Sequence, residues 1–173
     1  MLCFVSGGSA SGKSALAEAV CCALPGRHIY IATMPVRSEE DRRKVARHHA
    51  LRAGRGFAAT LEMPGRLAPV PPEDTVLFEC LSTFTANRMF SGEACPDWER
   101  ALWSELQCLI ARPGHTVIVS AEVGCDGAHF GAETAQYRRV LTALGCRLAA
   151  AADLAVEAVC GRAVVHKGTL PGF

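Results

Sequence analysis

A glycine-rich loop near the start of the chain has the residue types and spacing of a phosphate-binding site. The segment Gly7-Gly8-Ser9-Ala10-Ser11-Gly12-Lys13-Ser14 fits the pattern G-x-x-x-x-G-K-[ST]. Its glycines allow several backbone N–H groups to point at phosphate oxygens, and the N-terminus of a following helix adds partial positive charge. We expect Lys13 to contact the β- and γ-phosphates of a nucleoside triphosphate and the Ser14 hydroxyl to bind Mg²⁺.

Two acidic residues are candidates for the Mg²⁺ shell beside this loop. Glu79 ends the apolar run Val76–Glu79, and Glu122 comes shortly after the run Val117–Ser120. If both runs are strands of a parallel sheet, both carboxylates emerge at the edge that also carries the phosphate loop. Either residue could instead be an ordinary surface glutamate in a loop.

A strongly basic stretch surrounds two adjacent histidines, His48 and His49. Four arginines and a lysine lie around this pair: Arg42, Arg43, Lys44, Arg47 and Arg52. One interpretation is a solvated helix face. The other is an anion site in which a neutral imidazole attacks phosphorus and arginines stabilise the charge that develops. Adjacent helix positions diverge by about 100°, so only one of the two histidines can face a given phosphate.

Apolar runs and helical patterns alternate along the chain, with the phosphate loop between the first of each. We expect strands at Leu2–Ser6, His28–Ala32, Thr75–Glu79 and His115–Ser120, and a terminal hairpin at Leu154–Val159 and Ala163–Val165. Helices are expected at Ser14–Leu24 and Glu39–Leu51, after Glu79 through Phe90, from the cap Asp97 to Arg112, and at Ala132–Ala152. The four prolines of Pro64–Asp74 predict a surface loop. The pattern predicts an α/β fold with a mostly parallel sheet covered on both faces.

Composition limits the function classes. The chain has 173 residues, which predicts one domain spanning residues 1–173. Lys and Arg total 18 against 17 Asp and Glu, so nothing indicates a nucleic-acid partner. No apolar run reaches about 18 residues, so no transmembrane segment is expected. The nine cysteines include no C-x-x-C pair, which disfavours zinc and predicts free, buried cysteines in a cytoplasmic protein.

Taken together, the motifs resemble the bifunctional adenosylcobinamide kinase / adenosylcobinamide-phosphate guanylyltransferase family of cobalamin biosynthesis. The resemblance covers nearly the whole chain and keeps the family's order. It rests on the segments Val5–Ser14, Tyr30–Thr33, His48 with Arg52, Thr60–Glu62, Val76–Thr83 with Asn87, Glu122–Gly124, Tyr137-Arg138 and Arg147–Asp153. The phosphate loop alone is generic, whereas Tyr-Ile-Ala-Thr, Glu-Cys-Leu-Ser-Thr and Leu-Ala-Ala-Ala-Ala-Asp at fitting distances are specific.

The resemblance implies a RecA-like P-loop NTPase fold in a homotrimer, with ATP and GTP as substrates. It implies phosphorylation of the aminopropanol hydroxyl of adenosylcobinamide. Transfer of GMP from GTP, through a guanylylated histidine, to adenosylcobinamide-phosphate then gives adenosylcobinamide-GDP. The family spacing places the guanylylated histidine at His48. The nucleotide contacts that it implies, besides the phosphate loop, are Ala32, Thr33, Met34, His49, Ala50, Leu51, Arg52, Glu62 and Glu79, with Ser14 and Glu79 at the metal.

The chain departs from the family pattern in four places. Cys125–Phe130 stands where the family has a Gly-Ile-Val-Pro stretch, Arg138-Arg139 replaces Arg-Asp, and Gly145-Cys146 replaces Asn-Gln. After the histidine segment, Ala53–Phe57 stands where the family has Pro-x-x-Trp. These departures leave the phosphate chemistry better supported than corrinoid recognition. Two alternatives therefore stay open: a small-molecule P-loop kinase without nucleotidyl transfer, and a nucleotide-binding paralogue without catalytic activity.

Overall fold

The computed structural model describes the chain except for residues 37, 44–45, 47–53, 55, 124–130 and 173. A single sheet of seven strands in the order β3-β2-β4-β5-β1-β6-β7 runs through the described part. The strands are β1 (Leu2–Gly7), β2 (His28–Ala32), β3 (Phe57–Glu62), β4 (Thr75–Phe78), β5 (Thr116–Ala121), β6 (Leu154–Val159) and β7 (Arg162–Lys167). All neighbouring strands pair in parallel except β6 and β7, which form an antiparallel hairpin.

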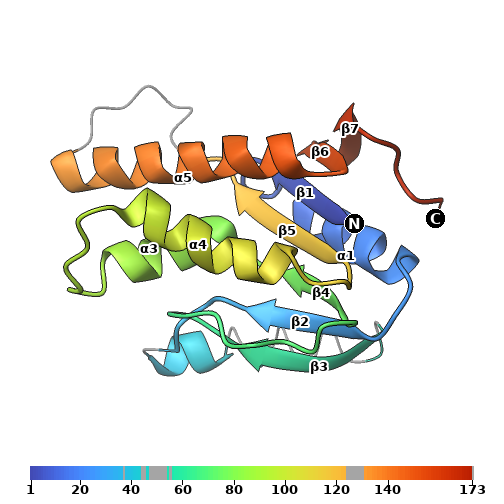
Figure 1. Ribbon diagram of the computed structural model, residues 1–173, viewed down its shortest axis with the longest axis horizontal. Coiled ribbons are helices and arrows are strands. Elements are labelled where there is room, and N and C mark those ends of the chain that lie inside the picture. Colours follow the sequence, from blue (N-terminus) through green and yellow to red (C-terminus); the bar gives the residue numbers. More distant parts are fainter. Residues whose placement is uncertain (37, 44–45, 47–53, 55, 124–130, 173) are drawn as a thin grey trace.

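Helices cover both faces of the sheet, as the alternating sequence pattern predicts (Figure 1). On one face lie α3 (Leu81–Met89), α4 (Trp98–Ile110) and α5 (Ala132–Ala151), whose apolar side chains pack on alternate strand residues such as Phe4 and Ile118. On the other face, α1 (Lys13–Ala23) packs Ala17 and Val20 against the intervening strand residues. Burial of both faces explains why the central strands are continuous apolar runs.

The capping residues fix where two of the helices begin. Asp97 caps α4, because its carboxylate accepts a hydrogen bond from the Arg100 backbone N–H at 3.0 Å. Ser38 and Asp41 cap the short helical run at residues 39–43 reciprocally, each side chain accepting the backbone N–H of the other. Both helix starts agree with the sequence prediction.

Two sequence expectations need correction. No strand was expected between the basic helix and Thr75, yet β3 forms the edge of the sheet there, beside β2. Its residues are half-buried or exposed and none is fully buried, so its apolar signal is weak. The cysteines are free thiols, but of those the structure describes only Cys3 and Cys21 are buried, and four others are exposed. Most of them are therefore not core residues.

No helix in the described ranges is both long enough and apolar enough to cross a membrane.

Candidate phosphate and nucleotide site

The loop after β1 has the geometry of a phosphate cradle. Gly7 takes φ +151°, and a Cβ there would lie 2.6 Å from the Ala158 carbonyl oxygen, so only glycine fits. Gly12 takes φ +93° and directly precedes α1, without any side chain capping the helix. The first N–H groups of α1 are therefore left for an anion, as P-loop chemistry requires. The half-buried Lys13 donates from Nζ to the Gly8 carbonyl at 3.0 Å, across the loop.

Neighbouring strands hold this loop on both sides. The Ser11 carbonyl accepts a hydrogen bond from the Gly161 N–H at 2.8 Å, which ties the loop to the β6–β7 turn. Cys160 and Gly161 both have positive φ in that turn, as a tight two-residue hairpin requires. On the other side, the Glu122 N–H donates to the Gly7 carbonyl at 3.1 Å. The cradle is thus tied to the β6–β7 turn on one side and to the end of β5 on the other.

A second polar cluster lies where β2 and β4 end, around the fully buried Thr33. The Thr33 N–H donates to Oε2 of Glu79 at 3.2 Å, and its hydroxyl donates to the Cys80 carbonyl at 3.3 Å. The Thr33 carbonyl accepts from the side-chain amide of Asn87 at 2.8 Å. Both backbone groups and the hydroxyl of Thr33 are therefore fixed by residues following β4.

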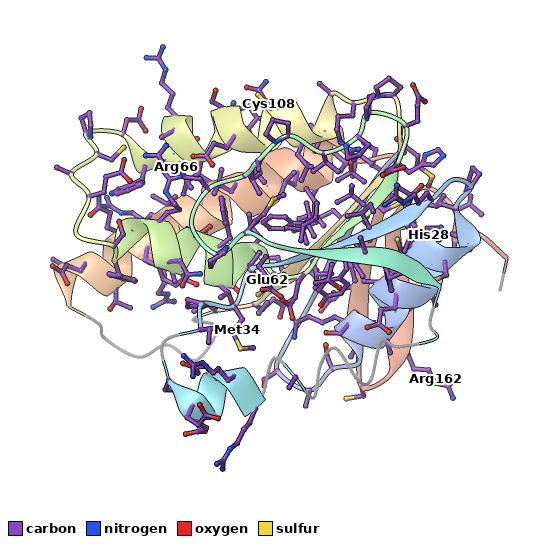
Figure 2. All side chains as sticks on the ribbon, turned by 90° about the horizontal axis from the view of Figure 1, so that it is seen from below. His28, Met34, Glu62, Arg66, Cys108 and Arg162 are labelled. Atoms are coloured by element: carbon purple, nitrogen blue, oxygen red, sulfur yellow. The ribbon has the colours of Figure 1, made fainter. Side chains whose placement is uncertain are left out.

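Residues expected to contact the nucleotide surround this cluster. Glu62 ends β3 in register with Ala32 at the end of β2, and the Met63 N–H donates to the Ala32 carbonyl at 2.8 Å. Figure 2 shows Met34 and Glu62 at the same end of the sheet, close to the helical run at residues 39–43. The structure thus brings Ala32, Thr33, Met34, Glu62 and Glu79 to one edge, as the sequence predicts.

The two acidic candidates for the Mg²⁺ shell lie at different distances from the cradle. Glu122 follows β5, the strand beside β1, whereas Glu79 follows β4, one strand farther away. With neighbouring strands about 4.8 Å apart, β4 lies about 10 Å from β1. The described residues contain no group of three or more acidic, histidine or cysteine side chains that could hold a metal by themselves. Hydroxyl and carboxylate oxygens near a phosphate site fit Mg²⁺, which keeps several waters and is completed by substrate phosphates.

Much of the basic histidine segment lies outside the described residues. This applies to the expected nucleophile His48 and to the expected nucleotide contacts His49, Ala50, Leu51 and Arg52. In the part that is described, Arg42 is exposed and pairs with Glu39 at 3.2 Å. The helical run starts beyond the end of β2, on the side of the molecule that carries Met34 (Figure 2).

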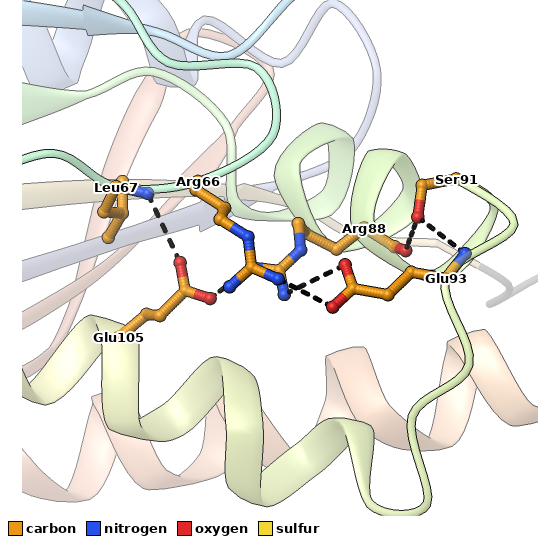
Figure 3. A network of polar contacts seen from close by, with 6 residues as sticks. All are labelled: Arg66, Leu67, Arg88, Ser91, Glu93 and Glu105. Carbon is orange, nitrogen blue, oxygen red and sulfur yellow. Dashed lines mark hydrogen bonds and ion pairs between the residues drawn. The ribbon is translucent and has the colours of Figure 1, made fainter.

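An ionic network is centred on the buried Arg88 (Figure 3). Arg88 of α3 is only 4% exposed and pairs with Glu105 of α4 and, at 3.7 Å, with Glu93. Glu105 also accepts the Leu67 N–H at 3.3 Å, and Glu93 pairs with Arg66 at 2.6 Å. The network therefore joins α3, α4 and the loop that follows β3.

Comparison with known proteins gives the family. The family described as CobU, cobinamide kinase / cobinamide phosphate guanyltransferase, matches residues 3–165. The chain belongs to this family.

Three curated relatives agree with that assignment. The chain is 34% identical over 170 residues to the bifunctional adenosylcobalamin biosynthesis protein CobU of Salmonella typhimurium, covering 88% of this chain and 92% of the relative. It is 32% identical to the CobU protein of Escherichia coli, with the same shares covered. It is 30% identical to the CobP protein of Pseudomonas aeruginosa over 141 residues, which is 77% of this chain and 78% of the relative.

The sequence motifs did not assign roles to two parts of this site. Asn87 was part of the resemblance, but its hydrogen bonds to Thr33 and Pro64 span 54 and 23 positions, and no local pattern signals such contacts. The support of the phosphate loop by Gly161 is equally nonlocal. The glycine-containing hairpin turn was visible in the sequence, but its packing against the loop was not.

Proposed function

We propose that this chain is a bifunctional adenosylcobinamide kinase and adenosylcobinamide-phosphate guanylyltransferase of cobalamin biosynthesis, acting as one nucleotide-binding domain over residues 1–173. Membership of the family and the formed phosphate cradle support this function. The observation that carries it is the strained, glycine-dependent loop at Gly7–Gly12 with Lys13 folded across it. Such a loop serves phosphoryl or nucleotidyl transfer.

In the kinase reaction, the cradle binds the triphosphate of ATP or GTP. The N–H groups at the start of α1 and the Lys13 ammonium stabilise the charge that builds up on the transferred phosphoryl group. Ser14, exposed in the first turn of α1, and Glu79, at the end of β4, would hold Mg²⁺. The ion supplies charge neutralisation at the β- and γ-phosphates.

In the guanylyl transfer, His48 is the proposed nucleophile. Its imidazole nitrogen attacks the α-phosphorus of GTP, the bond to the α–β bridging oxygen breaks, and pyrophosphate leaves. A phosphate oxygen of adenosylcobinamide-phosphate then attacks the same phosphorus, the P–N bond breaks, and adenosylcobinamide-GDP forms. Ala32, Thr33, Met34 and Glu62, held at the nucleotide edge, would contact the guanine nucleotide, together with His49–Arg52.

Capture of labelled GMP on the protein tests this function. The protein is incubated with α-labelled GTP and Mg²⁺ and then denatured, and we expect label to stay on the chain through an acid-labile, alkali-stable bond. His48→Ala should lose the label and still phosphorylate cobinamide, because the kinase step needs no protein nucleophile. His49→Ala is the matched control and should keep the label. Label that persists in His48→Ala and disappears in His49→Ala would assign the role to the neighbour.

The assembly and location are also proposals. The family resemblance implies a homotrimer, which light scattering on the purified chain would test. The free thiols among the described cysteines suit a reducing cytoplasm. A chain with neither label nor kinase activity that still binds GTP would be a non-catalytic paralogue, and one with kinase activity alone would be a small-molecule P-loop kinase.

A further inference from the structure

A cavity of about 250 Å³ lies beside the phosphate cradle, between strands β1 and β5 and helix α5. Its walls include Phe4, Ser6, Ser120, Glu122, Thr142 and Gly145. Two of these residues adjoin the cradle directly. Ser6 immediately precedes Gly7, and the Glu122 N–H is bonded to the Gly7 carbonyl. A molecule in this cavity therefore lies next to the loop that would hold the triphosphate.

The polar groups of the cavity are not used by the described part of the fold. The hydroxyls of Ser6 and Thr142 and the exposed carboxylate of Glu122 make no hydrogen bond or ion pair with any described residue. The buried Ser120 hydroxyl has only a long contact, 3.5 Å, to the Ala121 carbonyl. Phe4 and Leu141 supply apolar walls. This combination suits a short aliphatic chain that carries a hydroxyl or an amide.

A glycine keeps part of this space open. Gly145 lies in the interior of the 20-residue helix α5, where glycine is unfavourable compared with alanine. A Cβ there would lie 3.8 Å from the Phe4 ring, an ordinary contact distance, so packing against described atoms does not require glycine. The missing side chain instead enlarges the cavity beside the cradle.

We propose that this cavity binds the hydroxyl-bearing amino-alcohol arm of the phosphoryl acceptor and that Glu122 is its catalytic base, an inference that rests on the proposed kinase function. Since water occupies about 30 Å³ in the liquid, the volume holds several heavy atoms, enough for the arm but not for a corrin ring. The acceptor oxygen attacks the γ-phosphorus, the bond to the β–γ bridging oxygen breaks, and the nucleoside diphosphate leaves. The hydroxyl proton passes to the Glu122 carboxylate.

Two sets of variants test the proposal, with three readouts on the full chain: phosphorylation of cobinamide, retention of label from α-labelled GTP, and the melting temperature. Glu122→Gln should lower the kinase kcat by about 10²–10⁴, the usual contribution of a general base, and should still capture GMP. Glu133→Gln, which changes an exposed carboxylate on α5, is its control.

Gly145→Leu should raise KM for cobinamide at least about tenfold, while Ala150→Leu on the exposed side of the same helix should not.

Gly145→Ala separates binding from folding. It should keep or raise the melting temperature, because alanine favours the helix, and still raise KM for the acceptor. An unchanged KM in Gly145→Leu would overturn the assignment of the cavity. Loss of both reactions in Glu122→Gln, restored by excess Mg²⁺, would make Glu122 a metal ligand and overturn its role as base. If the unsubstituted chain neither phosphorylates cobinamide nor retains label, the proposed function itself fails.

Discussion

The side-chain amide of Asn87 donates to the carbonyl of Thr33 at 2.8 Å, and the same nitrogen donates to the Pro64 carbonyl at 2.9 Å. One side chain on α3 thereby joins the segment after β2 to the segment after β3. The first segment carries Thr33 and Met34, and the second directly follows Glu62, and all three residues are expected to contact the nucleotide. Because Glu79 holds the Thr33 N–H at the same time, the position of Thr33 depends on α3 and on the end of β4 together.

Asn87→Ala should weaken GTP binding more than it weakens the fold. Each lost hydrogen bond is worth about 1 kcal/mol, so two of them correspond to roughly a tenfold or greater rise in KM for GTP in the labelling reaction. Initial rates of labelling against GTP concentration measure this directly. Gln107→Ala, an exposed amide on α4, is the control. An unchanged KM in Asn87→Ala would show that Thr33 keeps its place without the amide.

Lys13→Ala should reduce both reactions by ~10²–10³ while the circular dichroism spectrum stays unchanged. The side chain stabilises charge on the phosphates, whereas within the described fold its ammonium donates one hydrogen bond, to the Gly8 carbonyl. Phosphorylation and GMP capture are assayed separately. Lys167→Ala, which removes an exposed lysine bonded to the Ala150 carbonyl, should leave both rates alone. Normal turnover of Lys13→Ala would refute the assignment of the phosphate loop.

Local sequence patterns predicted the elements whose structure depends on neighbouring residues in the chain. The strand, loop and helix around Gly12 follow from glycine spacing and from apolar runs, and the Asp97 cap follows from side-chain chemistry within one helical turn. The edge strand β3 was missed because Ala58 and Ala59 carry little strand signal and neither face of the strand is well buried. Its position comes from pairing with β2, which is a tertiary contact.

The candidate site likewise has residues that local patterns predict and residues that only the folded chain brings together. The phosphate-binding residues were predictable because eight consecutive positions build the cradle. The parts that hold it, Gly161 on one side and the Asn87 contacts on the other, come from distant segments that only the folded sheet brings together. The cavity beside Glu122 likewise depends on where α5 crosses β1 and β5, and sequence alone gives no such distance.

Removing the buried Arg88 from its ion pairs should cost far more stability than removing one partner of a surface ion pair. Arg88→Met leaves Glu105, which is 21% exposed, without its cation, and breaking such a pair typically costs about 3–5 kcal/mol. The free energy of unfolding in urea measures the loss. The control is Arg147→Met, whose pair with Glu99 is about 43–44% exposed and should change stability by about 0–1 kcal/mol. Equal losses of unfolding free energy in the two variants would contradict this prediction, because Arg88 would then matter no more than a surface arginine.

Two buried thiols should make the protein less stable in alkaline solution. Burial raises the pKa of Cys3 to about 11 and that of Cys21 to about 12, from an ordinary value of 9.0. The folded state therefore holds protons that the unfolded chain releases, so this contribution is complete below pH 9 and falls as the pH rises toward 11–12. Urea unfolding across that range measures it. Cys21→Ala should reduce the loss of stability in alkaline solution, and Cys146→Ala, which removes an exposed thiol, should not.

Since the thiolate is the reactive form, Cys3 and Cys21 should also resist thiol reagents until the chain unfolds. Rapid labelling of either in the folded protein would show that these two positions open to solvent.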